Sequence, residues 1–80
     1  MTQDEIFKAL LATFADIIPE VDLSAATFDD SLKELGANSI DRADIITETM
    51  EHAGVSLPMV SFAEAQSIGD IVRIIDGARS

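Results

Sequence analysis

Apolar residues recur at helical spacing near the start of the chain, and polar residues fill most positions between them. The apolar stripe consists of Ile6, Phe7, Leu10, Leu11, Phe14, Ile17 and Ile18. Thr2 and Glu5 stand just before it with the spacing of a capping box, in which each side chain bonds the backbone N–H of the other residue. Pro19 ends the pattern, because proline lacks the N–H that a helix interior needs. The spacing therefore predicts a helix that begins after Thr2 and ends before Pro19.

A second periodic segment runs from about Ser39 to Ala53, and Gly54 is suited to cap its C-terminus. This segment is apolar on two faces, of which Ile45, Ile46, Thr49 and Ala53 form the first. The other face is a stripe of Ile40, Ala43, Thr47 and Met50, bordered by Asp41, Asp44, Glu48 and Glu51. The stripe is either additional core or an exposed strip, and an apolar strip with a charged rim is typical of a docking surface. On the second interpretation, we expect Ile40 and Met50 to be exposed.

The remaining segments are less regular. Residues 19–38 form a long loop, which Phe28, Leu32 and Leu35 are spaced to pin onto the core through one short helical turn. Residues 55–60 are expected to be an extended connector, because Pro58 disfavours helix, and residues 62–66 a short helix. Ser67 and Asp70 have the spacing of a variant capping box, which predicts a last helix. Its buried stripe would be Ile68, Ile71, Val72, Ile74 and Ile75, with fraying from Asp76 to Ser80.

These elements predict an all-α fold, a small right-turning bundle of three main helices plus one short helix, in a single domain over residues 1–80. No segment alternates in the manner of a β-strand. Hydrophobic residues make up 48% of the chain, but only four are Phe and none is Trp or Tyr. The core of this small domain must therefore be mostly aliphatic.

Charge and composition exclude several classes of function. Fifteen acidic residues against five basic ones give a net charge of −10, which disfavours nucleic acid and suits a partner with a basic surface. The absence of cysteine excludes disulfides and thiolate chemistry within the chain. No apolar run approaches membrane-spanning length, and Asp4 and Glu5 interrupt any signal-peptide pattern. We expect a cytoplasmic protein that is a monomer and binds no membrane.

Ser39 is the candidate functional residue. It lies at the predicted start of the second helix, where unpaired backbone N–H groups favour an anion. Ser39 is therefore either a structural cap or the attachment point of a phosphate-linked group. A catalytic serine would need a base nearby, and the one histidine, His52, lies thirteen residues along the same helix, about 20 Å away. No calcium-loop pattern occurs either, so we predict no catalytic residue and no metal site.

The segment from Asp30 to Ile45 resembles the phosphopantetheine-attachment region of acyl carrier proteins, and the helical pattern of the whole chain agrees. The resemblance implies that Ser39 is esterified by a 4′-phosphopantetheine arm from coenzyme A, through a phosphopantetheinyl transferase, and that the arm's thiol holds acyl groups. It also implies a partner-docking helix comprising Ile40, Asp41, Arg42, Ala43, Asp44, Thr47, Met50 and Glu51. Asn38 and Ile40 replace the family's usual Asp and Leu, which leaves the hydroxyl and the helix start in place.

Residues 36–46, together with residues 57–60 and 62–65, are similar to free-standing polyketide carriers, and more narrowly to the donor carriers of β-branching cassettes. This similarity implies an acetyl group, made by decarboxylating a malonyl group, that is presented to a hydroxymethylglutaryl-synthase-like enzyme. An acyltransferase and a decarboxylating ketosynthase would be further partners. The alternatives are a housekeeping fatty-acid carrier, and an unmodified acidic interaction domain in which Ser39 is only a cap.

Overall fold

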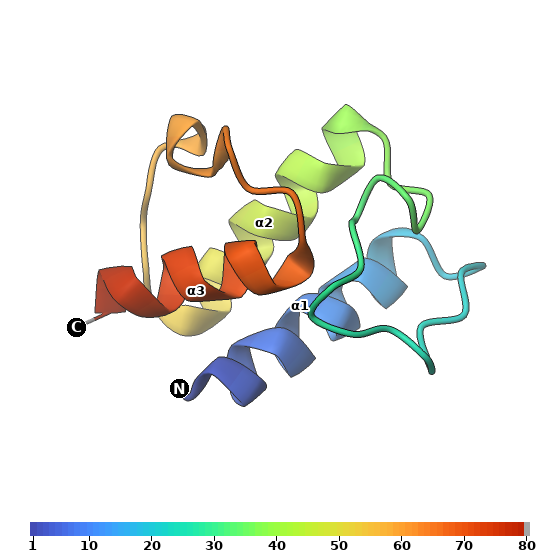
Figure 1. Ribbon diagram of the computed structural model, residues 1–80, viewed down its shortest axis with the longest axis horizontal. Helices are drawn as coiled ribbons and strands as arrows, with labels where there is room; N and C mark the ends of the chain where they lie inside the picture. The colour runs from blue at the N-terminus through green and yellow to red at the C-terminus, as the bar shows by residue number, and fades with distance from the viewer. Residues whose placement is uncertain (80) are drawn as a thin grey trace.

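Three α-helices and one 3₁₀ turn make up the regular structure of residues 1–79, the part of the chain that this computed structural model describes (Figure 1). In chain order they are α1 (Gln3–Ile17), α2 (Ser39–Ala53), the 3₁₀ turn η1 (Met59–Phe62) and α3 (Ile68–Arg79). No strand occurs among these residues. The predicted all-α fold with three main helices and one short one is confirmed. None of the helices within residues 1–79 is long and apolar enough to cross a membrane.

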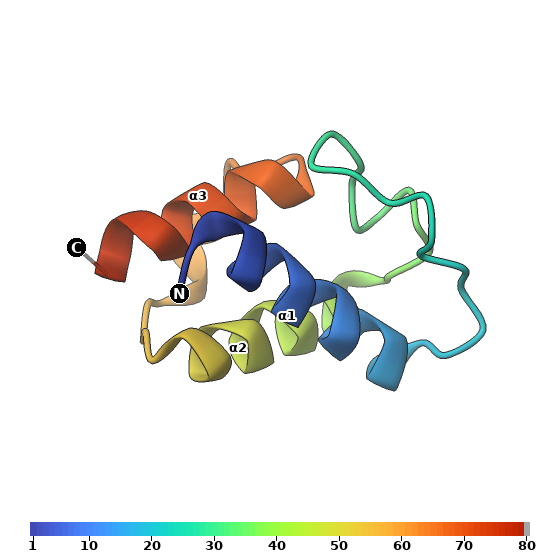
Figure 2. The same cartoon turned by 90° about the horizontal axis from the view of Figure 1, so that it is seen from below.

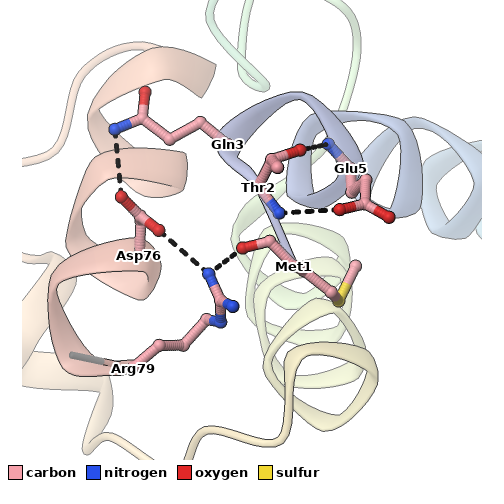
Figure 3. Close-up of polar contacts among 6 residues, drawn as sticks. All are labelled: Met1, Thr2, Gln3, Glu5, Asp76 and Arg79. Atoms are coloured by element: carbon pink, nitrogen blue, oxygen red, sulfur yellow. Dashed lines mark hydrogen bonds and ion pairs between the residues drawn. The ribbon is translucent and has the colours of Figure 1, made fainter.

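The capping box at the start of α1 is present in full. The Thr2 hydroxyl accepts the Glu5 N–H at 3.2 Å, and a Glu5 carboxylate oxygen accepts the Thr2 N–H at 2.8 Å (Figure 3). The helix ends at Ile17, two residues before Pro19. Both ends of α1 therefore lie where the local sequence predicts them.

α1 packs against both α2 and α3, as the two views of the ribbon show (Figures 1 and 2). The core between the helices is largely aliphatic. Its fully or almost fully buried apolar side chains are Ile6, Leu10, Phe14, Ile18, Leu32, Ala37, Ile45, Ile46, Met50, Phe62, Ile68, Ile71, Val72 and Ile75. α2 ends at Gly54, which has a φ of +71°, a left-handed conformation that glycine adopts without strain.

The short helix differs from the prediction in place and in type. It is a 3₁₀ turn at Met59–Phe62 rather than a helix over residues 62–66. Pro58 stands just before the turn in an extended conformation, and its carbonyl accepts the Ser61 N–H at 2.9 Å. Proline excludes helix on its N-terminal side, but its carbonyl can still start a helical turn after it. The expectation that residues 59 and 60 are extended is wrong for this reason.

The C-terminal helix also extends further than expected. α3 continues to Arg79 instead of fraying from Asp76, while Ser80 lies outside the described residues. The Asp76 carboxylate accepts a hydrogen bond from the Gln3 amide at 3.1 Å and pairs with Arg79 at 3.0 Å. Arg79 also donates to the carbonyl oxygen of Met1 (Figure 3). These contacts hold the last turn of α3 against the start of α1.

The long loop between α1 and α2 is anchored to the core, as predicted. The ring centroids of Phe28 and Phe7 are 4.7 Å apart, and Leu32 is buried. The Leu35 N–H bonds the Ser31 carbonyl at 3.0 Å, which closes one helical turn within the loop. The loop therefore delivers the chain to the start of α2 in a defined position.

Candidate functional site

The residue that caps α2 is Asn38, not Ser39. The Asn38 side-chain oxygen accepts the Asp41 N–H at 2.8 Å, and its backbone is extended. Asparagine ranks among the best N-cap residues, so either neighbour is chemically suitable. Gly36 has a φ of +110°, which side-chain-bearing residues rarely adopt. This turn and the cap together make Ser39 the first residue inside the helix.

The Ser39 hydroxyl is consequently available. Ser39 is exposed, and its hydroxyl forms no hydrogen bond with any residue that the structure describes. It lies in the first turn of α2, where the backbone N–H groups favour negative charge. The interpretation of Ser39 as only a structural cap is therefore wrong, because Asn38 performs that role.

A cleft of about 620 Å³ opens beside Ser39. Four parts of the chain form its walls: the end of the long loop, the first half of α2, the segment around η1, and the start of α3. The apolar lining residues are Leu32, Ala43, Ile46, Met59, Phe62, Ala63, Ala65 and Ile71. The polar lining residues are Ser31, Lys33, Glu34, Ser39, Arg42 and Gln66. A group attached to Ser39 would thus start at a cleft with a mainly apolar wall.

Arg42 belongs to this cleft. Its guanidinium Nη1 donates to the Ala37 carbonyl at 3.0 Å, and the side chain is half-buried. The sequence contains the spacing that reveals this placement: Arg42 precedes Ile45 by three residues and Ile46 by four, so it shares their helical face. The resemblance named Arg42 as a partner-docking residue, and the structure places its side chain in the cleft wall beside Ser39.

The second apolar stripe of α2 divides between surface and core. Ile40 is 72% exposed, whereas Met50 is only 5% exposed, so the expectation that Met50 is exposed is wrong. Met50 follows Ile46 by four residues, which places it only about 40° around the helix from that core residue. Ala43 is half-buried in the cleft wall. Between Ser39 and His52, the exposed residues of α2 are Ile40, Asp44, Thr47, Glu48 and Glu51, and Asp41 is half-buried.

The positions of the histidine and of the acidic side chains bear on whether the site could be catalytic or bind a metal. His52 is exposed and lies in the last turn of α2, at the end of the helix opposite to Ser39. Within residues 1–79, no three His, Asp or Glu side chains are grouped so that they could hold a metal ion. The chemistry that the site supports best is attachment of a group through the Ser39 oxygen.

Sequence reasoning missed the part of the cleft that η1 supplies. Met59 and Phe62 line it, although residues 55–60 were expected to be a plain connector. The available signal was composition, because a connector seldom needs as many large apolar residues as Val55, Leu57, Met59 and Val60.

Comparisons with known proteins agree with this geometry. Residues 8–75 match the protein family described as "Phosphopantetheine attachment site". The chain is 32% identical over 75 residues to the polyketide biosynthesis acyl-carrier-protein AcpK of Bacillus subtilis (strain 168), covering 94% of this chain and 92% of that protein. It also matches a chain in the crystal structure of the Curacin biosynthetic pathway HMG synthase in complex with acetyl donor-ACP. That match has a TM-score of 0.78, 30% identity and complete coverage of both chains.

Proposed function

Because the chain belongs to the phosphopantetheine-attachment family of acyl carrier proteins, we propose that Ser39 bears the 4′-phosphopantetheine arm and that the protein presents acyl thioesters to enzymes of polyketide biosynthesis. The observation on which this rests is the Ser39 hydroxyl, which is exposed, unused by the cap and located at the rim of a cleft. Polyketide biosynthesis is proposed from the similarity to the Bacillus subtilis carrier.

The residues around Ser39 fit the arm. Its phosphate would lie beside the cationic side chains of Lys33 and Arg42, and its chain along the apolar wall formed in part by Ile46 and Phe62. When bound, the arm supplies a terminal thiol that forms thioesters. The protein itself contains no cysteine, so the attached group is the source of the reactive sulfur.

Attachment makes Ser39 the nucleophile. Its oxygen forms a bond to the phosphorus of the phosphopantetheine half of coenzyme A, the P–O bond to the nucleotide half breaks, and the hydroxyl proton is lost. A base is needed for that proton, and His52 lies at the far end of α2. We assign the base to a phosphopantetheinyl transferase, and the carrier itself is non-catalytic in this proposal. We place the reaction in the cytoplasm, where coenzyme A is available.

The narrower role that we propose is acetyl donor in β-branching. The similarity to the chain from the HMG synthase complex with acetyl donor-ACP supports it. An acyltransferase would load a malonyl group, a decarboxylating ketosynthase would convert it to acetyl, and a hydroxymethylglutaryl-synthase-like enzyme would accept the acetyl group. Each of these enzymes would meet the same carrier surface.

The docking surface in this proposal is the exposed part of α2. Ile40 supplies its apolar centre, and the carboxylates of Asp44, Glu48 and Glu51 border it. Such a surface complements an apolar spot surrounded by Lys and Arg on a partner enzyme. Asp41 and Thr47 complete the surface, and Met50 supports it from within the core.

The attachment is tested by intact mass after incubation with coenzyme A and a promiscuous phosphopantetheinyl transferase. We expect the mass of one phosphopantetheine to be added to the native chain and to Ser31→Ala, which alters another serine of the cleft. Ser39→Ala should gain nothing. Absence of the gain in the native chain would leave only an unmodified interaction domain.

The donor role is tested separately, by transfer of a labelled acetyl group from the loaded carrier to a hydroxymethylglutaryl-synthase-like enzyme. Transfer supports the donor role. A carrier that fails here and instead serves fatty-acid synthase enzymes has a housekeeping function.

A further inference from the structure

The basic residues of this acidic chain are distributed unevenly. Of five lysine and arginine residues, three form ion pairs with an aspartate of their own helix, at nitrogen–oxygen distances of 3.0–3.3 Å: Lys8–Asp4, Arg73–Asp70 and Arg79–Asp76. The other two, Lys33 and Arg42, form no ion pair with any of residues 1–79. Both line the cleft beside Ser39. The two cations that form no ion pair within residues 1–79 are thus gathered at the candidate attachment point.

The Arg42 side chain is held against the residues that precede Ser39. Arg42 lies one helical turn after Ser39, and side chains on a helix lean toward its N-terminus. The hydrogen bond from Nη1 to the carbonyl of Ala37, 3.0 Å long, holds the guanidinium beside a residue that lies two positions before Ser39. A guanidinium has five N–H donors. Since one Nη1 proton is used here, donors remain for an oxygen anion attached to Ser39.

The charge of the cleft wall is opposite to that of the chain. Glu34 is the one acidic residue among those that line the cleft within residues 1–79, against the two cations Lys33 and Arg42. The chain as a whole carries a net charge of −10, so it repels anions from most of its surface. The local excess of positive charge beside Ser39 therefore favours an anion at this place.

We propose that Arg42, together with Lys33, binds the phosphate of the group attached to Ser39 and thereby directs the first part of the arm along the cleft. This inference rests on the proposed function, because the phosphate arrives with the arm. Arginine suits the role, since its planar guanidinium donates two parallel hydrogen bonds to a phosphate. Arg42 is then a positioning residue for the arm rather than a contact for partner enzymes, and Lys33 adds a second positive charge.

The test compares the unmodified and the phosphopantetheine-bearing forms of each variant, so that effects common to both forms cancel. The variants are Arg42→Gln, Arg42→Lys and, as a matched control, Arg73→Gln, which removes a cation from outside the cleft. For each protein, the Tm of the unmodified form is subtracted from the Tm of the modified form. We expect this difference to be about 2–4 °C lower in Arg42→Gln than in the native chain. Arg42→Lys should recover part of this difference, and Arg73→Gln should equal the native chain. In 0.5 M salt the difference should shrink.

Nuclear magnetic resonance supplies a second readout that does not depend on stability. On modification, the Nε–Hε resonance of Arg42 should shift while that of Arg73 stays in place. The ³¹P resonance of the arm should differ between the native chain and Arg42→Gln. The inference would be overturned if the native chain and Arg42→Gln had equal ³¹P resonances and an equal change in Tm on modification. It would also be overturned if Arg42→Gln weakened only the reaction with partner enzymes and left both of these measurements unchanged. Failure of the mass gain at Ser39 would instead overturn the proposed function.

Discussion

The backbone N–H of Gly69, in the first turn of α3, donates a 2.9 Å hydrogen bond to the carbonyl oxygen of Phe28 in the long loop. The adjacent Ile68 N–H donates to the Asp30 carbonyl at 2.8 Å. Two N–H groups that have no partner within their own helix are thus satisfied by the loop that leads to Ser39. The relationship explains why a loop with little regular structure is still held in a defined position.

Gly69→Ala tests this connection. A Cβ at Gly69 would lie 3.1 Å from the Phe28 carbonyl oxygen and 3.1 Å from its ring. The carbonyl is already held at hydrogen-bond distance by the Gly69 N–H, so loop and helix must move apart by a few tenths of an ångström. Alanine favours helix over glycine by up to about 1 kcal/mol, but overpacking costs about 1–3 kcal/mol. We expect the free energy of unfolding to fall by about 1 kcal/mol in urea denaturation.

Gly77→Ala is the matched control within the same helix. A Cβ there would meet nothing within 4 Å among the neighbouring parts of residues 1–79. The substitution should raise the free energy of unfolding by about 0.5–1 kcal/mol. If Gly69→Ala were equally stabilising, the contact between loop and helix would be easily displaced.

The separation of cap and attachment residue gives a second prediction. Asn38→Ala removes the oxygen that accepts the Asp41 N–H, and loss of an N-cap costs about 0.5–2 kcal/mol. Ser39→Ala removes a hydroxyl without a partner among the described residues, so its free energy of unfolding should stay within about 0.5 kcal/mol of the native value. Thermal unfolding and intact mass together should show that Asn38→Ala is less stable than the native chain but is still modified. Ser39→Ala should keep the native stability but should not be modified. A large loss of stability in Ser39→Ala would return the capping role to the serine.

The parts of the fold that were predictable from sequence depend on local chemistry. Thr2 with Glu5, and Ser67 with Asp70, specify helix starts within four residues of chain, and Pro19 and Gly54 specify ends. The Ser67 hydroxyl indeed accepts the Asp70 N–H at 3.1 Å. Such signals do not depend on what packs against the helix, so the helix ends that they predict are found in the folded protein.

The errors concern choices that only packing resolves. Asn38 and Ser39 are both good capping residues, and only the folded structure shows that Asn38 is the cap. Met50 lies between the inner and outer faces of α2, so its burial depends on the chain that covers that edge. The cleft could not be predicted from the sequence for the same reason, because its walls come from four separate segments of the chain.

Ile40 and Met50 give a third prediction, since they were expected to behave alike and do not. Ile40→Glu places a carboxylate at a position where the native residue is 72% exposed. The free energy of unfolding should therefore change by no more than about 0.5 kcal/mol. Met50→Ala truncates a buried side chain and should cost about 2–5 kcal/mol. Met50→Glu should be less stable still, because it buries a charge. Urea denaturation of the three variants measures the contrast, and equal losses at Ile40 and Met50 would show that both are core residues.

A fourth prediction concerns acid. The Asp70 carboxylate accepts the backbone N–H groups of Gln66 at 3.0 Å and Ser67 at 3.2 Å, and Arg73 lies 3.3 Å away. These hydrogen bonds, with the smaller effect of Arg73, lower the pKa of Asp70 below its ordinary value, which is about 3.9 in an unfolded chain. The unfolded chain therefore binds this proton more readily than the folded protein. The stability that Asp70 contributes is complete above about pH 4 and is lost as the pH falls toward its lowered pKa.

The measurement is Tm from pH 7 to pH 2.5 for the native chain, Asp70→Asn and Asp44→Asn. Asp44 is exposed and accepts no hydrogen bond within residues 1–79. The two variants therefore lose the same charge, but only Asp70→Asn loses it from an oxygen that accepts backbone N–H groups and pairs with Arg73. The comparison between them therefore cancels the general relief of repulsion in an acidic chain. Asp70→Asn should have the lower Tm at pH 7, and the two curves should converge as the pH falls below 4. If the two curves ran parallel down to pH 2.5, the ionised carboxylate of Asp70 would contribute nothing beyond its share of the net charge.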